Sequence, residues 1–265
     1  SVAILAQVVN SRVDRCLSRT MITQCVNSLA EQFNFLRDQH VMQFLLLGLE
    51  NAGKTTLLYR LKIPQWKKNE ITREIEHIKQ DKKDPSYHYE ELTGKSDTIP
   101  KYGIWDIPGN EHMKRMWPMF YKYIRITAVI FVVDASLPEQ GQVPEKIAMM
   151  DEARRQLHFL LNEDELRRAA VILILNTKKP SEDTPSKPEL NQTEYVAAVQ
   201  EMLGIKGFMK SAAQAERFAV FTMDCADAAP NTSTWTEILK RIRLVHDHFG
   251  EGSIVEKTGE AGTAD

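Results

Sequence analysis

Residues 47–56 read Leu-Gly-Leu-Glu-Asn-Ala-Gly-Lys-Thr-Thr, and this stretch decides the fold. It follows an apolar run at 41–47 that is too short for a typical helix and is typical of a strand buried on both faces. A helical pattern at 55–61 begins with the last two residues of the quoted stretch. The segment from Gly48 to Thr55 therefore matches GxxxxGK[ST] between a strand and a helix, the pattern of a phosphate-binding loop.

Each type of residue in this loop is suited to binding phosphate. Glycines let the backbone curl, so that successive N–H groups and the helix N-terminus point at phosphate oxygens. Lys54 would neutralise the β- and γ-phosphates, and Thr55 would ligate Mg²⁺ as the cofactor. The predicted nucleotide-binding residues of the loop are Gly48, Glu50, Asn51, Ala52, Gly53, Lys54, Thr55 and Thr56.

Outward from the loop, apolar runs and helical patterns alternate along the chain. Buried strands are predicted at 103–106, 128–134, 169–176 and 218–224. Helices are predicted at 145–161, 193–203 and 234–248. This alternation indicates an α/β domain in which helices cover both faces of a mostly parallel central sheet.

The domain is expected to span residues 41–249. Apolar residues at helical spacing before it predict an amphipathic N-terminal helical extension at 1–40. The polar, glycine-bearing end at 250–265 is typical of a tail. Two polar stretches, near 65–100 and near 180–190, interrupt the alternation of strands and helices and are predicted to be insertions on loops.

Composition narrows the classes of function. The 265 residues carry a net charge of −2, so no overall field favours binding to nucleic acid, and no apolar run approaches the ~20 residues of a transmembrane helix. Three cysteines cannot close a disulfide framework, which indicates a reducing compartment. We expect an intracellular protein, cytoplasmic or peripheral to a membrane-associated assembly. The acid-poor first thirty residues leave a mitochondrial complex as the alternative.

The phosphate loop and the segments after it resemble the Arf-like small GTPases. Residues 47–62 resemble the opening of that family, Trp105-Asp106-Ile-Pro-Gly109-Asn110-Glu111 resembles its WDxGGQ segment, and Phe131-Val-Val-Asp134 resembles its central strand. The resemblance covers about residues 41–247 and implies a P-loop small G-protein fold. It implies that Asp106 holds Mg²⁺ through water and that the N–H of Gly109 senses the γ-phosphate. The base-side contacts that it implies are Asn176, Lys178, Lys179, Cys225 and Ala226.

A further hydroxyl ligand to Mg²⁺ is implied in the first switch. Thr72 lies the usual 17 residues after Thr55, but Ser86, followed by Tyr89, fits the local pattern and the distance to Trp105 better. We favour Ser86 over Thr72. The alternative is that the insertion has dismantled this switch and neither residue reaches the metal.

The sequence departs from the family at three positions that matter for chemistry. Asn110 replaces the hydrolytic glutamine and is one methylene shorter, about 1.5 Å short of the attacking water, which predicts slow or absent turnover. Pro108 stands at a glycine position and fixes φ, which predicts a stiff second switch. The NKxD motif is here Asn176-Thr177-Lys178-Lys179. Because Lys179 would present donors to the donors of guanine, the base could be that of GTP or ATP.

These observations favour a degenerate Arf-like GTPase that binds a nucleoside triphosphate with Mg²⁺ and hydrolyses it little. We expect it to act as an interaction or structural subunit of a larger assembly, so enzymatic activity is left uncertain. An active GTPase switch with atypical loops and a nucleotide-free scaffold are the alternatives. Protein partners are expected through the N-terminal helix and the region of Trp105, Trp117 and Phe120, although these aromatic residues fit core packing equally well. We expect no nucleic acid partner, and peripheral contact with a membrane stays open.

Overall fold

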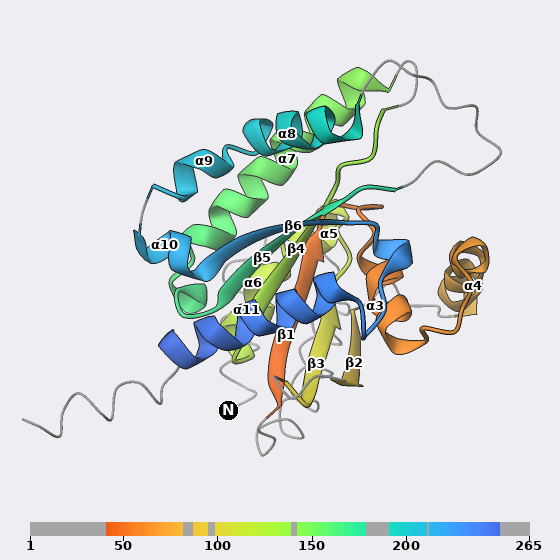
Figure 1. Ribbon diagram of the computed structural model, residues 1–265, viewed down its shortest axis with the longest axis horizontal. Coiled ribbons are helices and arrows are strands. Elements are labelled where there is room, and N and C mark those ends of the chain that lie inside the picture. Colours follow the sequence, from red (N-terminus) through yellow and green to blue (C-terminus); the bar gives the residue numbers. More distant parts are fainter. Residues whose placement is uncertain are drawn as a thin grey trace, which may run out of the picture.

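The computed structural model describes residues 41–81, 87–94, 99–138, 142–178, 191–210 and 212–249. The predicted insertion at 180–190, the extension at 1–40 and the tail at 250–265 lie outside these ranges. The strands are β1 (Met42–Gly48), β2 (His88–Thr93), β3 (Lys101–Asp106), β4 (Ala128–Asp134), β5 (Ala170–Asn176) and β6 (Phe218–Met223). They form a sheet of order β2-β3-β1-β4-β5-β6 in which only β2 runs antiparallel to its neighbour (Figure 1).

Helices follow the strands along the chain. They are α3 (Lys54–Lys62), α4 (Lys68–Asp81), α5 (Glu111–Lys114), α6 (Trp117–Tyr123), α7 (Val143–Asn162), α8 (Gln192–Met202), α9 (Ile205–Phe208), α10 (Ala212–Arg217) and α11 (Ser233–Phe249), with 3-10 helices η1 (Asp164–Leu166) and η2 (Cys225–Asp227). In the described part of the chain, no helix is long and apolar enough to cross a membrane.

Two apolar cores lie on opposite faces of the sheet. Because successive side chains of a strand point to opposite faces, Phe44 and Leu46 enter one core and Leu45 and Leu47 enter the other. Residues of α3 and α11 fill the first core, and residues of α6, α7 and α8 fill the second. Both faces of the central strands are therefore buried, which explains their continuous apolar runs and confirms the predicted layers.

The stretch at 65–100 differs from the expectation of a loop insertion. It contains α4, whose Ile71 and Ile75 pack against Tyr59 of α3, and the edge strand β2. Only one narrow face of α4 packs on α3, so the helix has few apolar residues among many charged ones. Its helical pattern is therefore hard to recognise in the sequence. Strand β2 is half-buried and polar, so it lacks the apolar run by which the other strands were predicted.

The topology gathers polar residues at one edge of the sheet. The phosphate loop follows β1, Asp106 ends β3, Asp134 ends β4, Asn176 ends β5 and Asp224 follows β6. All of these strands are parallel, so their carboxyl ends meet at the same edge. In open α/β sheets this edge is where ligands bind. The candidate site is therefore placed there.

Candidate nucleotide site

The phosphate loop curls through backbone conformations that favour glycine. Gly48 and Gly53 have φ of 145° and 104°, and Asn51 between them has φ of 58°. A Cβ atom on Gly48 would lie 2.2 Å from the carbonyl oxygen of Val132, and one on Gly53 would lie 2.3 Å from Nδ2 of Asn176. Both glycines are needed because the neighbouring strands approach the loop closely.

Lys54 holds its positive charge within the loop. Its side chain is buried, and Nζ donates hydrogen bonds to the carbonyl oxygens of Gly48 at 2.9 Å and Leu49 at 2.7 Å. Helix α3 starts at this residue and has no acidic residue in its first turn. No acidic residue of α3 itself neutralises the positive end of the helix dipole, which together with the ammonium group favours an anion at the loop.

Thr55 and Asp106 come together from α3 and β3. The Thr55 hydroxyl donates to Oδ2 of Asp106 at 2.8 Å, and Asp106 is buried. A hydroxyl and a carboxylate are oxygen ligands of the kind that Mg²⁺ prefers, and Mg²⁺ usually takes its other ligands from phosphates and water. These two residues fit the predicted metal site. Ser86 lies outside the described residues, and of Thr72 only its position within α4 is described.

Asn176 links three parts of the site. Its Nδ2 donates to the carbonyl oxygen of Ala52 at 2.9 Å, and its Oδ1 accepts from the backbone N–H of Cys225 at 3.0 Å. Burial raises the pKa of the Cys225 thiol, which keeps it protonated and inert. Asn176 therefore fixes η2 to the phosphate loop. The N–H of Ala226 is engaged within η2, because it donates to Oδ1 of Asp224 at 2.9 Å.

Lys178 reaches back to the phosphate loop. Its Nζ donates to the carbonyl oxygen of Asn51 at 3.1 Å and forms an ion pair with Oδ2 of Asp134 at 3.0 Å. Lys178, one of the base-side residues that the resemblance implies, therefore supplies an ammonium group at the phosphate loop. Lys179 lies outside the described residues.

Asp134 is the shared acceptor for Ser136, Lys146 and Lys178. Burial raises the pKa of Asp134, but hydrogen bonds from Ser136 and the charges of Lys178 and Lys146 outweigh burial and hold the pKa below its usual value. Lys146 of α7 also lies 3.0 Å from Oδ2 of Asp134. The carboxylate therefore stays ionised and connects β4, α7 and the segment after β5.

The second switch begins against the phosphate loop. A Cβ atom on Gly109 would lie 2.1 Å from the carbonyl oxygen of Gly48 and 2.7 Å from the backbone nitrogen of Glu50. Pro108 beside it accepts a hydrogen bond from the indole N–H of Trp117 at 3.2 Å. Gly109 therefore lies directly against the phosphate loop.

Asn110 is engaged in local structure. Its Oδ1 accepts from the backbone N–H of Met113 at 2.9 Å, so its side chain caps the N-terminus of α5. The side-chain oxygen that would position an attacking water is already in use in this conformation.

The aromatic residues predicted to meet partners lie in the core. Trp105, Trp117 and Phe120 are all buried, and the ring of Tyr89 lies 4.5 Å from that of Trp105 between centroids. Tyr87 covers Phe120 at 5.2 Å. The half-buried rings of Tyr87 and Tyr89 therefore pack on Trp105 and Phe120, two of the three predicted residues.

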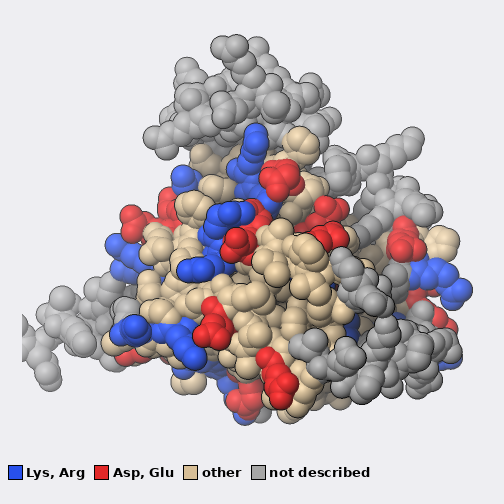
Figure 2. All heavy atoms as spheres, turned by 90° about the horizontal axis from the view of Figure 1, so that it is seen from above, with Lys and Arg blue, Asp and Glu red and all other residues tan. Residues whose placement is uncertain are grey.

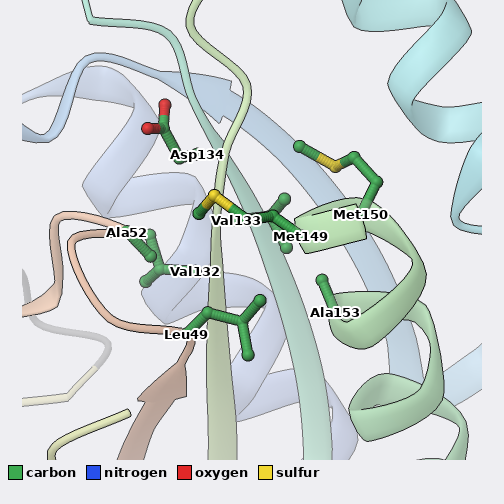
Figure 3. A pocket seen from close by; sticks show the side chains of 8 residues that line it. All are labelled: Leu49, Ala52, Val132, Val133, Asp134, Met149, Met150 and Ala153. Atoms are coloured by element: carbon green, nitrogen blue, oxygen red, sulfur yellow. The ribbon is translucent and has the colours of Figure 1, made fainter. Parts of the chain in front are cut away.

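A small hollow of about 10 Å³, partly open to solvent, lies on one side of the phosphate loop (Figure 3). Leu49 and Ala52 of the loop, the end of β4 and residues of α7 line it. The lining is apolar except for Asp134, so this hollow is not suited to a phosphate. On the face shown in Figure 2, acidic and basic side chains are interspersed.

Sequence reasoning missed three charged residues around the site: Asp134, Asp224 and Lys68. Asp134 ends β4 and Asp224 follows β6, and this position was the available signal, because parallel strands end at the same edge. Lys68 had no such signal, since it stands in a run of charged residues far from the motifs.

A family model shows which known proteins this chain is related to. A model of the ADP-ribosylation factor family matches residues 29–218, which is most of the chain. The fold is also similar to that of the Arl6 BBS3 small GTPase from Trypanosoma brucei, solved with the bound nucleotide analogue GppNp. In that comparison the TM-score is 0.48 and the sequence identity 17%, with 79% of this chain and 99% of the other covered. The chain belongs to the ADP-ribosylation factor family, and its fold is that of a P-loop small G protein.

Proposed function

We propose that this protein binds a nucleoside triphosphate with Mg²⁺, hydrolyses it slowly or not at all, and serves as an interaction or structural subunit of a larger assembly. One contrast carries the proposal. The binding residues Lys54, Thr55 and Asp106 are held in place, whereas Asn110, at the hydrolytic position, caps a helix.

Nucleotide binding and nucleotide hydrolysis depend on different residues of the site. Binding needs the loop amides, the Lys54 ammonium and two metal ligands, and all of these lie together. Turnover needs an amide that positions water, because positioning provides nearly all of the catalysis in phosphoryl transfer. Asn110 is too short, and its oxygen is already hydrogen bonded. The triphosphate would therefore persist, and the second switch would keep one conformation for a partner.

The identity of the base is a separate part of the proposal. Arf-family GTPases generally bind guanine nucleotides with Mg²⁺. Here the aspartate that accepts from guanine N1–H and N2–H₂ is replaced by Lys179. We propose that guanine preference is weak or is replaced by adenine preference. A GTP preference above about a hundred-fold over ATP in competitive binding would contradict this, since two unpaired donors reduce affinity by roughly ten-fold or more each.

The test is to identify and count the nucleotide released when the purified protein is denatured. Triphosphate close to one per chain supports the proposal. Diphosphate indicates a working switch, and no nucleotide, together with no uptake of added GTP or ATP, indicates an empty scaffold. Lys54→Ala serves as the matched control, because it removes the buried ammonium group from the loop.

A further inference from the structure

Helix α4 is attached to the base side of the candidate site, although it lies outside α3 and away from the sheet (Figure 1). Lys68, the first residue of α4, places Nζ 2.5 Å from Oδ2 of Asp224 and 3.1 Å from Oδ1 of Asp227. Asp227 is the last residue of η2, and Asp224 caps that 3-10 helix. The N-terminus of α4 is therefore joined to η2 by a single cation between two carboxylates.

The Asp224 half of this contact is buried. The side chain of Asp224 is 4% exposed, whereas the side chains of Lys68 and Asp227 are 41% and 42% exposed. A buried carboxylate needs charged or donor partners, and removal of one is felt more strongly than the loss of a surface ion pair. Partial burial lowers the pKa of Lys68, but its bonds to Asp224 and Asp227 raise it above the usual value, so Lys68 is charged at neutral pH.

A second attachment runs parallel to the first. Arg60 of α3 donates to the carbonyl oxygen of Ala228, directly after η2, at 3.2 Å. The same guanidinium donates to the carbonyl oxygens of Pro64, at 3.3 Å, and Trp66 in the connection between α3 and α4. On the apolar side, α4 packs on α3 through the cluster that contains Ile71 and Ile75. Helix α4 is thus held both to the helix that begins at the phosphate loop and to η2.

The contacts continue from η2 to the phosphate loop. Cys225, in the same 3-10 helix as Asp227, donates to Asn176, and Asn176 donates to Ala52 of the loop. An unbroken series of hydrogen bonds and short covalent segments therefore connects Lys68 with the loop. Each link is a polar contact of 3.1 Å or less between elements far apart in the sequence.

We propose that Lys68 is a positioning residue for the nucleotide site: it holds η2 against the bound nucleotide, and it thereby couples the docking of α4 to nucleotide occupancy. The inference rests on the proposed nucleotide binding. Because coupling between two sites is reciprocal, nucleotide stabilises docked α4 by the same factor by which docked α4 strengthens nucleotide binding. A partner that lifts α4 from α3 would accelerate nucleotide release.

The test measures dissociation of a fluorescent N-methylanthraniloyl GTP or ATP, whichever the unaltered protein binds more tightly, after addition of excess unlabelled nucleotide with Mg²⁺. Lys68→Ala is expected to raise the dissociation rate about ten-fold, the effect of losing one charged hydrogen bond. Lys68→Arg keeps the cation and should stay within about two-fold of the unaltered rate. Lys67→Ala is the matched control, because Lys67 is exposed one position earlier and no carboxylate contact involves its side chain among the described ion pairs.

Asp227→Asn tests the same contact from the other side at an exposed position, so it should fold and should also raise the rate. Hydrogen exchange gives an independent readout: nucleotide should slow exchange of the α4 amides in the unaltered protein and not in Lys68→Ala. Equal dissociation rates for Lys68→Ala, Asp227→Asn and the unaltered protein would overturn the inference, even if the melting temperature of nucleotide-free Lys68→Ala fell. If the unaltered protein takes up neither nucleotide, the proposed function itself fails.

Discussion

The side-chain oxygen of Asn110 accepts a hydrogen bond from the backbone N–H of Met113 at 2.9 Å, and this bond caps α5. Asn110→Gln is therefore expected to lose the cap while extending the amide toward the attacking water. We predict a fall in the free energy of unfolding by about 1 kcal/mol and no more than a small gain in hydrolysis. Urea unfolding and single-turnover hydrolysis measure the two effects.

Asn110→Asp is the control for the cap, because aspartate caps a helix as well as asparagine does. It should leave the stability nearly unchanged. A single-turnover rate at or above the usual intrinsic rate of about 10⁻⁴ s⁻¹, in the unaltered protein or in Asn110→Gln, would contradict the proposed loss of turnover.

Lys54→Ala is predicted to empty the nucleotide site. The buried ammonium lies between the carbonyl oxygens of Gly48 and Leu49 and is the loop's own cation. Without it, the phosphate charges lose their main partner, and added triphosphate should no longer raise the melting temperature. Thermal unfolding with and without nucleotide tests this, and an equal upward shift in both proteins would show that binding does not depend on Lys54.

The sequence predicts the parts of this protein that have strong local signals. Apolar runs that end at a glycine loop, an acid or an asparagine locate β1, β3, β4, β5 and β6. The spacing of the phosphate loop predicts Lys54 and Thr55, and the structure brings Thr55 to Asp106 from 51 residues away. These features depend on neighbouring residues or on a fixed spacing, so a single sequence is enough to predict them.

Features that depend on tertiary partners escape the sequence. Helix α4 is amphipathic, but its charged residues outnumber the few apolar ones that pack on α3, and β2 is a polar edge strand without an apolar run. Lys178 is implied as a base-side residue by the resemblance, but its contact with Asn51 depends on the path of the chain after β5. The path of an irregular segment leaves no trace in periodicity.

Lys178→Leu is predicted to weaken nucleotide binding. Its ammonium holds the carbonyl of Asn51, a loop residue with positive φ, and pairs with Asp134. Because Lys178 is nearly half exposed, the expected loss of affinity is modest, about five- to ten-fold. Lys206→Leu is a control at an exposed lysine in α9. Equilibrium titration with fluorescent triphosphate measures the change, and equal affinities for both variants would show that Lys178 has no part in the site.

The attachment of the second switch to α7 is sensitive to acid. Glu152 of α7 accepts a hydrogen bond from Lys114 of α5 at 2.7 Å, and Lys114 also pairs with Glu111. The bond from Lys114 lowers the pKa of Glu152 to about 2, against a partial burial that raises it. The folded state therefore favours the ionised form of Glu152.

The sign of the effect follows from this lowered pKa. The stabilising contribution of Glu152 is fully present above its unfolded pKa of about 4.3 and is lost as the pH falls toward about 2. Glu152→Gln should therefore lower the free energy of unfolding at pH 6, and the gap from the unaltered protein should narrow between pH 4.5 and 2.5. Glu237→Gln, in an exposed i,i+3 pair with Lys240 on α11, is the control and should give a small gap at every pH. Urea unfolding across this range measures both gaps, and a Glu152→Gln gap that stays constant down to pH 2.5 would show that the contact with Lys114 does not depend on the charge of Glu152.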